Sequence, residues 1–131
     1  MKVAEPIVFI SHFRIKEGKL EGYRQLQGRI TKLLEVDKPR TFAYLAYLSE
    51  DGTHATIVHA FADAEAMDLH FEGADSRSRE AYQFLVPDGW EIYGRPTEAT
   101  LEGMRREAAA AHVTLTIEPE HAPGFLRSEP G

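Results

Sequence analysis

The stretch from Thr41 to Phe61 constrains the fold of this chain more than any other segment. It predicts two β-strands joined by a tight turn at Asp51-Gly52, because Asp-Gly is favoured in type I′ turns, whose central residues both need positive φ. Apolar side chains occupy both faces of both arms, so neither face is clearly polar. A sheet that is apolar on both sides must be covered on both sides. Helices can cover one face, and the other predicts a partner subunit or a second sheet.

The composition restricts the class of protein. The chain has 131 residues, of which 43% are hydrophobic and 27% charged, which is typical of a soluble globular protein of one domain. No apolar run approaches the roughly 20 residues that span a membrane, and the start is too short and polar for a signal peptide. The absence of cysteine excludes disulfides and thiolate metal sites and favours a cytoplasmic location. A net charge of −6 without a basic stripe argues against nucleic-acid binding.

The N-terminal half predicts a strand followed by a helix. Residues Pro6 to Ile15 alternate as a strand, and Lys19 to Glu35 carry apolar residues at helical spacing. The expected stripe consists of Leu20, Tyr23, Leu26, Ile30, Leu33 and Leu34. Gly22 and Gly28 weaken this helix by about 1 kcal/mol each, which suggests that something packs close to them.

The C-terminal half predicts a second helix in two pieces, then a strand, a helix and a last strand. Asp63 is the expected N-cap of the first piece and Ser76 that of the second. Residues Pro87 to Gly89 are expected to form a turn before a strand that starts at Trp90. Thr97 is expected to cap a further helix, and Val113 to Ile117 alternate as a fifth strand.

This element order predicts an α+β fold. The first six elements follow the ferredoxin-like split βαβ order β-α-β-β-α-β with an antiparallel sheet, and a C-terminal helix and strand are appended. Right-handed crossovers place both crossover helices on one face. The domain is expected to comprise residues 1–131, with a core at about 6–95 and the extension at about 96–131. A second copy is expected to cover the free face, so the expected assembly is a homodimer.

Three motifs carry a resemblance to a known group. They are FISHFRIKEGKLEGY at Phe9 to Tyr23, HAFADAEAMDLHFEGADS at His59 to Ser76, and WEIYGRPTEATLEGM from Trp90 followed by GFLR at Gly124 to Arg127. From Pro6 to Arg127 the chain resembles the antibiotic-biosynthesis-monooxygenase-like proteins of the dimeric α+β barrel superfamily. The resemblance implies sheets paired into a barrel and a ligand site between the sheet and the helices of one subunit. The group includes quinone-forming monooxygenases, heme-degrading oxygenases and proteins without an assigned reaction.

The resemblance also implies roles for single residues. His70 matches a histidine that is common in the group. Ser11 falls where the heme-degrading branch has a strand asparagine, and Phe61 falls where it has a tryptophan. The axial histidine of that branch would fall near Ala81 or Tyr82, where this chain has none, which argues against heme degradation.

The histidines are the main catalytic candidates. His70 and His59 are predicted on surfaces that meet between sheet and helices, where either imidazole could act as a base or hold a structural hydrogen bond. Ser11, Phe61, Tyr82 and Trp90 are the candidate substrate-binding residues, although aromatic residues more often fill cores. His12 is expected on the opposite sheet face, at the barrel interface or its rim, and His54 at the surface. The histidines lack a recognised ligand spacing, so neither a metal nor another cofactor is expected.

Two hypotheses of different class remain open. The first is a cofactor-independent monooxygenase in which a histidine deprotonates a small aromatic, quinol or polyketide-like compound that then reacts with oxygen. The second is a non-catalytic barrel that binds a small apolar ligand or has a purely structural or regulatory role. A cavity of several hundred Å³ beside the histidines would favour a ligand site, whereas a filled core would favour the structural role.

Overall fold

A computed structural model describes residues 5–127 of the chain. Its nine elements follow the predicted order, with the second helix divided in two. The strands are β1 (Ile7–Ile15), β2 (Thr41–Leu48), β3 (His54–Phe61), β4 (Leu85–Tyr93) and β5 (Leu115–Glu118). The helices are α1 (Leu20–Asp37), α2 (Ala64–Phe71), α3 (Ala74–Ala81) and α4 (Glu98–Ala111).

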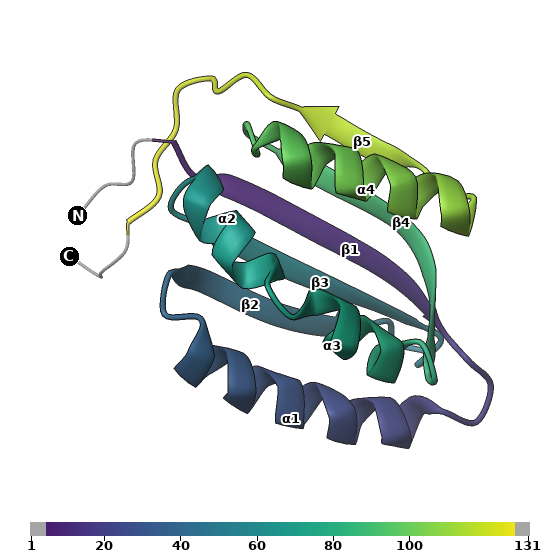
Figure 1. The fold of residues 1–131 in the computed structure, drawn as a ribbon. Coiled ribbons are helices and arrows are strands. Elements are labelled where there is room, and N and C mark those ends of the chain that lie inside the picture. The colour runs from purple at the N-terminus through teal and green to yellow at the C-terminus, as the bar shows by residue number, and fades with distance from the viewer. Residues whose placement is uncertain (1–4, 128–131) are drawn as a thin grey trace.

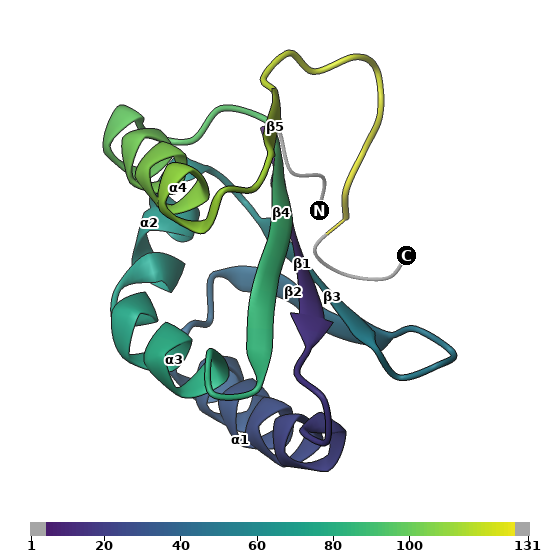
Figure 2. The ribbon, with the colours of Figure 1, turned by 90° about the vertical axis from the view of Figure 1, so that its right-hand side faces the viewer.

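The strands form one sheet in the order β2-β3-β1-β4-β5, so the α+β prediction is confirmed. The first four strands pair antiparallel, as in the ferredoxin-like arrangement, and β5 adds to the edge parallel to β4. All four helices lie on one face of the sheet, as Figures 1 and 2 show. The chain after β5 passes on the other side (Figure 2).

The second crossover is broken at Glu72-Gly73. Asp63 caps α2 as predicted, because its carboxylate accepts a hydrogen bond from the amide of Ala66 at 2.8 Å. The prediction that Ser76 caps the second piece is wrong. Gly73 occupies the N-cap of α3 with φ of 80°, a left-handed conformation that glycine adopts without a steric penalty, and Ser76 lies inside the helix.

The connection between β2 and β3 differs from the predicted two-residue turn. The strands separate after Leu48, and Gly52 has positive φ whereas Asp51 does not, so the turn is not type I′. The Asp51 carboxylate accepts hydrogen bonds from the Ser49 hydroxyl and from both the amide and the hydroxyl of Thr53. These bonds stabilise a longer loop that the dipeptide alone did not reveal.

Residues Pro87 to Gly89 do not form a turn, which corrects a second expectation. They lie inside β4, where His12 of β1 pairs with Gly89 and Phe13 pairs with Pro87. Asp88 is therefore the extra residue of a β-bulge, which locally bends the strand. The bulge accommodates the proline without ending the strand.

The core under the helices consists of two clusters. The larger one packs under α2 and α4 around Phe61, Met67 and Ile92, and the smaller one packs under α1 around Tyr23 and Leu85. Most of the predicted apolar stripe of α1 faces the sheet, but Leu33 is 48% exposed and does not belong to it. No helix among the described residues is long and apolar enough to cross a bilayer.

The extension is tied to the core by polar contacts. Thr97 caps α4 as predicted, since its hydroxyl oxygen accepts from the amide of Thr100 at 3.3 Å. The carboxylate of Asp68 on α2 accepts from the hydroxyls of both Thr97 and Thr100, at 2.9 and 2.6 Å. These bonds fix the start of α4 beside α2 and thus position the whole helix.

The two glycines of α1 provide a matched pair for testing the packing. A Cβ at Gly22 would lie 2.5 Å from the ring of Phe84, whereas a Cβ at Gly28 would meet nothing within 4 Å. Gly22→Ala should therefore lower the free energy of unfolding by about 1 to 2 kcal/mol through overpacking. Gly28→Ala should raise it by up to about 1 kcal/mol through helix propensity. Urea unfolding of both variants measures this, and equal stabilisation by both would contradict the packing described.

Candidate functional site

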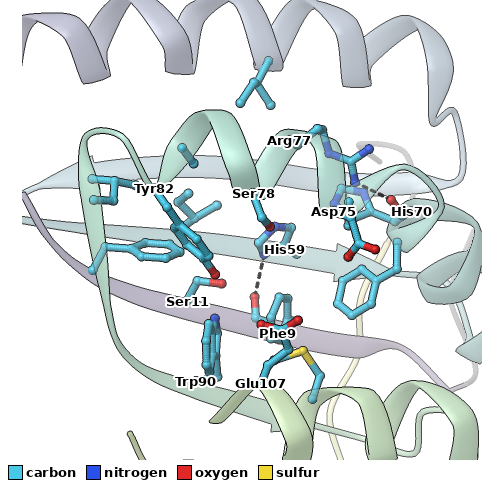
Figure 3. Close-up of a pocket in the computed structure, with 18 of the residues that line it drawn as sticks. Phe9, Ser11, His59, His70, Asp75, Arg77, Ser78, Tyr82, Trp90 and Glu107 are labelled. Carbon is cyan, nitrogen blue, oxygen red and sulfur yellow. Dashed lines mark hydrogen bonds between the residues drawn. The ribbon is translucent and has the colours of Figure 1, made fainter. Parts of the chain in front are cut away.

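A cavity of about 650 Å³ lies between the sheet and the helices, and we call it the sheet–helix cavity. Its floor is the helix-covered face of β1, β3 and β4, and its walls come from α1, α3 and α4 (Figure 3). α3 contributes one helical face at spacings of three and four, namely Ala74, Arg77, Ser78 and Ala81. The volume lies within the range of small-molecule sites.

The strand register explains why the cavity extends down to the middle of β1. Ser11 pairs with Ile57 of β3 on one side and with Trp90 of β4 on the other. Its β1 neighbours on the same face are Phe9 and Phe13, each buried and much larger. A small residue between two phenylalanines leaves space above the middle of β1, and this space belongs to the cavity.

His59 projects from the middle of β3 and is only 6% exposed. Its Nδ1 lies 3.1 Å from the carbonyl oxygen of Phe9. A carbonyl only accepts, so Nδ1 carries the proton and Nε2 of the neutral ring keeps its lone pair. Burial, with a smaller contribution from the Arg77 charge, lowers the pKa of His59 to about 4, although the bond to Phe9 opposes this shift. The ring is therefore neutral at pH 7, with one nitrogen able to accept a proton.

His70 lies beside it at the end of α2 and is 3% exposed. The two imidazole rings meet edge to face with centroids 5.1 Å apart, and Nδ1 of His70 is hydrogen-bonded to the Thr41 hydroxyl at 2.8 Å. Burial first, and then the nearby His59, Arg77 and Lys38, lower the pKa of His70 to about 3. Both imidazoles are therefore neutral well below pH 7, whereas an unperturbed imidazole titrates near pH 6.5.

Ser11, Tyr82 and Trp90 gather at the end of the cavity away from His70 (Figure 3). Neither the Ser11 hydroxyl nor the Trp90 indole N–H bonds to another residue in the range 5–127. Burial, reinforced by the Glu107 carboxylate, raises the pKa of Tyr82, so its phenol stays protonated at neutral pH. The three side chains therefore offer hydrogen-bond donors to an oxygen atom of a ligand.

Two predicted residues lie elsewhere. Phe61 is fully buried behind the histidines, stacked on His59 with centroids 6.0 Å apart, and does not line the cavity. His12 lies on the opposite face of the sheet, where Nε2 contacts the carboxylate of Glu91 and Nδ1 lies 3.4 Å from the Thr56 hydroxyl. His54 is exposed at the hairpin end, as expected.

Sequence reasoning missed several polar residues of the cavity, among them Tyr44, Arg77 and Glu107. Tyr44 pairs with His59 across β2 and β3, so the register would have placed it once the strands were aligned. The position of Arg77 on the cavity side of α3 was missed because Ser76 was predicted as the N-cap, which placed the start of α3 too late. Glu107 comes from the extension, and no pattern linked α4 to the site. Within residues 5–127, no group of three or more histidines or acids is arranged to hold a metal ion.

The buried histidines predict a specific pH dependence of stability. The pKa values of His59 and His70 lie near 4 and 3 in the folded protein, below the usual value of 6.5. At a pH between the folded values and 6.5, the unfolded chain therefore binds more protons than the folded protein. Above pH 6.5 the two histidines therefore do not lower the free energy of unfolding. As the pH falls toward 4, the unfolded chain takes up protons on these histidines, and the free energy of unfolding decreases. Between pH 7 and 5 the free energy of unfolding should drop by roughly 2 kcal/mol for each histidine.

Urea unfolding at pH 7 and pH 5 measures this drop. His59→Gln should remove about half of it, and His54→Gln at the exposed hairpin should leave it unchanged. An unaltered pH dependence in His59→Gln would mean that His59 is not buried in neutral form.

Solved structures of other proteins share the fold of this chain but have little sequence similarity to it. No protein-family model matches this sequence, and no curated protein is significantly similar to it. MupZ from Pseudomonas fluorescens has a similar structure, with a TM-score of 0.73 and 15% identity over 98% of this chain and 100% of its own. SnoaB, a cofactor-independent oxygenase from Streptomyces nogalater, has a TM-score of 0.60 and 12% identity over 72% and 98% of the two chains.

A third structure, from Caulobacter crescentus, belongs to a protein proposed to be an antibiotic biosynthesis monooxygenase. It has a TM-score of 0.61 and 10% identity and covers 70% of this chain and 90% of its own. At such identities the likeness establishes the fold. The chain thus resembles the antibiotic-biosynthesis-monooxygenase-like proteins and shares their α+β fold.

Proposed function

We propose that the protein is a cofactor-independent monooxygenase that acts on a small aromatic, quinol or polyketide-like compound in the sheet–helix cavity. The observation that carries the proposal is His59, whose Nδ1 proton is committed to the Phe9 carbonyl and whose Nε2 is therefore a proton acceptor. The fold shared with SnoaB, a cofactor-independent oxygenase, supports the same class of reaction.

The proposed reaction needs only a cavity that buries and orients the substrate and a base that removes its proton. With an anthrone as substrate, His59 takes a proton from the ring carbon and leaves an electron-rich carbanion. This anion reduces oxygen directly to a peroxide bound to that carbon, and the His59 imidazolium returns its proton to give the hydroperoxide. Loss of water then gives a ketone, so one oxygen atom enters the product, the other leaves as water, and the substrate supplies all four electrons.

The low pKa of His59 requires that the cavity also stabilise the substrate anion. A base with a pKa of about 4 is weak, so proton transfer is unfavourable unless the anion is stabilised at the same time. An anion beside the imidazolium would raise the pKa of His59, and the Arg77 guanidinium, the Tyr82 phenol and the Trp90 indole all line the same cavity. In this proposal His70 orients the ring edge of His59 and is a second candidate base.

The alternative is a barrel that binds a small apolar ligand without chemistry. The cavity of about 650 Å³ supports either ligand-dependent function over a purely structural role, because Phe9, Phe13 and Trp90 leave space between them. The same side chains would bind an aromatic ligand in both cases. The two functions differ in whether the bound compound reacts with oxygen.

We also propose that a second copy of the chain covers the free face of the sheet. That face carries Val8, Ile10 and Val58, all only partly buried, and the large side chains of Leu45 and Tyr47, which are 48% and 56% exposed. An apolar patch of this kind, which adjoins the polar pair His12–Glu91 on the same face, is typical of a protein interface. A homodimer would bury it and close the proposed barrel.

Oxygen consumption tests the proposed reaction. With an anthrone or a naphthohydroquinone, the wild-type protein should consume oxygen faster than buffer does. His59→Gln should lower kcat by about 100-fold or more, because the proton acceptor is lost. His70→Ala should also lower it, while His54→Gln should not. Uptake at the buffer rate with every compound would contradict the proposed reaction and leave ligand binding as the function.

Sedimentation equilibrium tests the proposed dimer. The wild-type protein should have twice the mass of the chain at micromolar concentration. Val58→Glu places a charge at the centre of the free face and should yield monomer, whereas Leu33→Glu, on the exposed side of α1, should leave the dimer intact. A wild-type monomer with this face in contact with water would refute the proposed assembly.

A further inference from the structure

Arg77 is the cation at the histidine end of the sheet–helix cavity. It projects from α3 and lies close to His70, with Asp75 nearby, as Figure 3 shows. Two of its N–H groups donate to backbone carbonyls, Nη2 to that of His70 at 2.6 Å and Nη1 to that of Glu72 at 3.1 Å. A guanidinium has five N–H donors, so the remaining ones are available to a ligand.

No carboxylate among residues 5–127 pairs with Arg77. The other arginine of the cavity, Arg106, lies 3.9 Å from the Glu102 carboxylate, whereas Arg77 has only the two carbonyls. Asp75 lines the same cavity but is exposed and forms no ion pair with it. The charge of Arg77 is therefore held in place without a compensating anion.

The buried titratable groups around Arg77 are neutral at pH 7. His59 and His70 are uncharged there, and burial raises the pKa of Tyr44, so its phenol is protonated as well. Burial likewise lowers the pKa of Arg77, which is the cost of placing a cation in this position. A half-buried cation among neutral groups is best stabilised by an anion of the ligand.

We propose that the cavity selects an aromatic ligand with a carboxylate, which binds the Arg77 guanidinium while the ring lies over Ser11. This inference rests on the proposed ligand site and names the class of compound that it takes. The planar guanidinium suits a carboxylate, because two parallel N–H donors match its two oxygens. The ring then occupies the space between Phe9 and Trp90, where the hydroxyl of Ser11 and the indole N–H reach a ring oxygen.

Arg77 also has a structural role that the test must separate from binding. Its two carbonyl bonds close the end of α2, so its removal should lower stability whether or not it binds a ligand. Stability alone therefore does not distinguish the two roles. The charge of the ligand does, because a purely structural arginine would affect charged and uncharged ligands alike.

The experiment compares anthraquinone-2-carboxylate with 2-(hydroxymethyl)anthraquinone, which share a ring system and differ in charge. Binding is followed by the indole N–H resonance of Trp90, which is the single tryptophan of the chain and lines the cavity. The wild-type protein should bind the carboxylate at least about tenfold more tightly than the alcohol, as expected for one charged pair.

Three variants isolate the charge of Arg77. Arg77→Met should abolish the preference for the carboxylate and leave the affinity for the alcohol within about twofold, and Arg77→Lys, which keeps the charge, should retain part of the preference. Arg79→Met, at an exposed position of α3 that does not line the cavity, is the matched control and should retain all of it. Equal affinities of the wild-type protein for both compounds, an unchanged preference in Arg77→Met, or equal losses for both compounds would each overturn the inference.

The result is independent of the proposed reaction, because it measures equilibrium binding. A carboxylate preference without any oxygen uptake would support the anion site and contradict the oxygenase. Oxygen uptake with a neutral anthrone that is unaffected by Arg77→Met, together with equal binding of the two anthraquinones, would support the oxygenase and overturn the anion site.

Discussion

All four helices lie on one face of the sheet, and the other features of the molecule depend on this constraint. Right-handed crossovers place the crossover helices on one face, and within residues 5–127 no helix covers the opposite face. On the covered side the helices pack on large residues near the ends of the strands, so the core divides into two clusters. Between them Ser11 is too small to reach the helices, and the cavity lies above it. On the other side Leu45 and Tyr47 are left exposed.

The same arrangement determines the chemistry of the cavity. Because His59 projects from a central strand, it is buried and neutral, and the Phe9 carbonyl on the adjacent strand selects its tautomer. The break at Gly73 turns the chain so that α3 presents Arg77 to the cavity. A neutral proton acceptor, an unpaired cation and several donors thus surround one apolar space. A site of this kind binds an aromatic anion well, and it also stabilises one that forms during a reaction.

Much of this could be predicted from the sequence, and the failures have physical reasons. The order of strands and helices along the chain followed from alternation and helical spacing, because these patterns reflect burial directly. The turn at Asp51-Gly52 was misassigned since Asp51 bonds to Ser49 and Thr53 rather than adopting positive φ. The segment at Pro87 was misassigned because a bulge and a turn use similar residues. In the site, strand and helix positions together with the family resemblance suggested Ser11, His59 and His70, and all three line the cavity. Arg77 and Glu107 were not predicted, because only the three-dimensional packing of α3 and α4 directs them to the cavity.

The central claim is that the space above Ser11 is a ligand site and not part of a packed core. The most direct measurement is the stability and ligand binding of Ser11→Leu, which would fill the floor of the cavity with an apolar side chain. If the space is there, the variant should unfold within about 1 kcal/mol of the wild-type protein, or be more stable, because the added methyl groups are buried without overpacking. Its affinity for anthraquinone-2-carboxylate should fall by at least about tenfold. A loss of several kcal/mol in stability, or unchanged binding of the anthraquinone, would contradict the account.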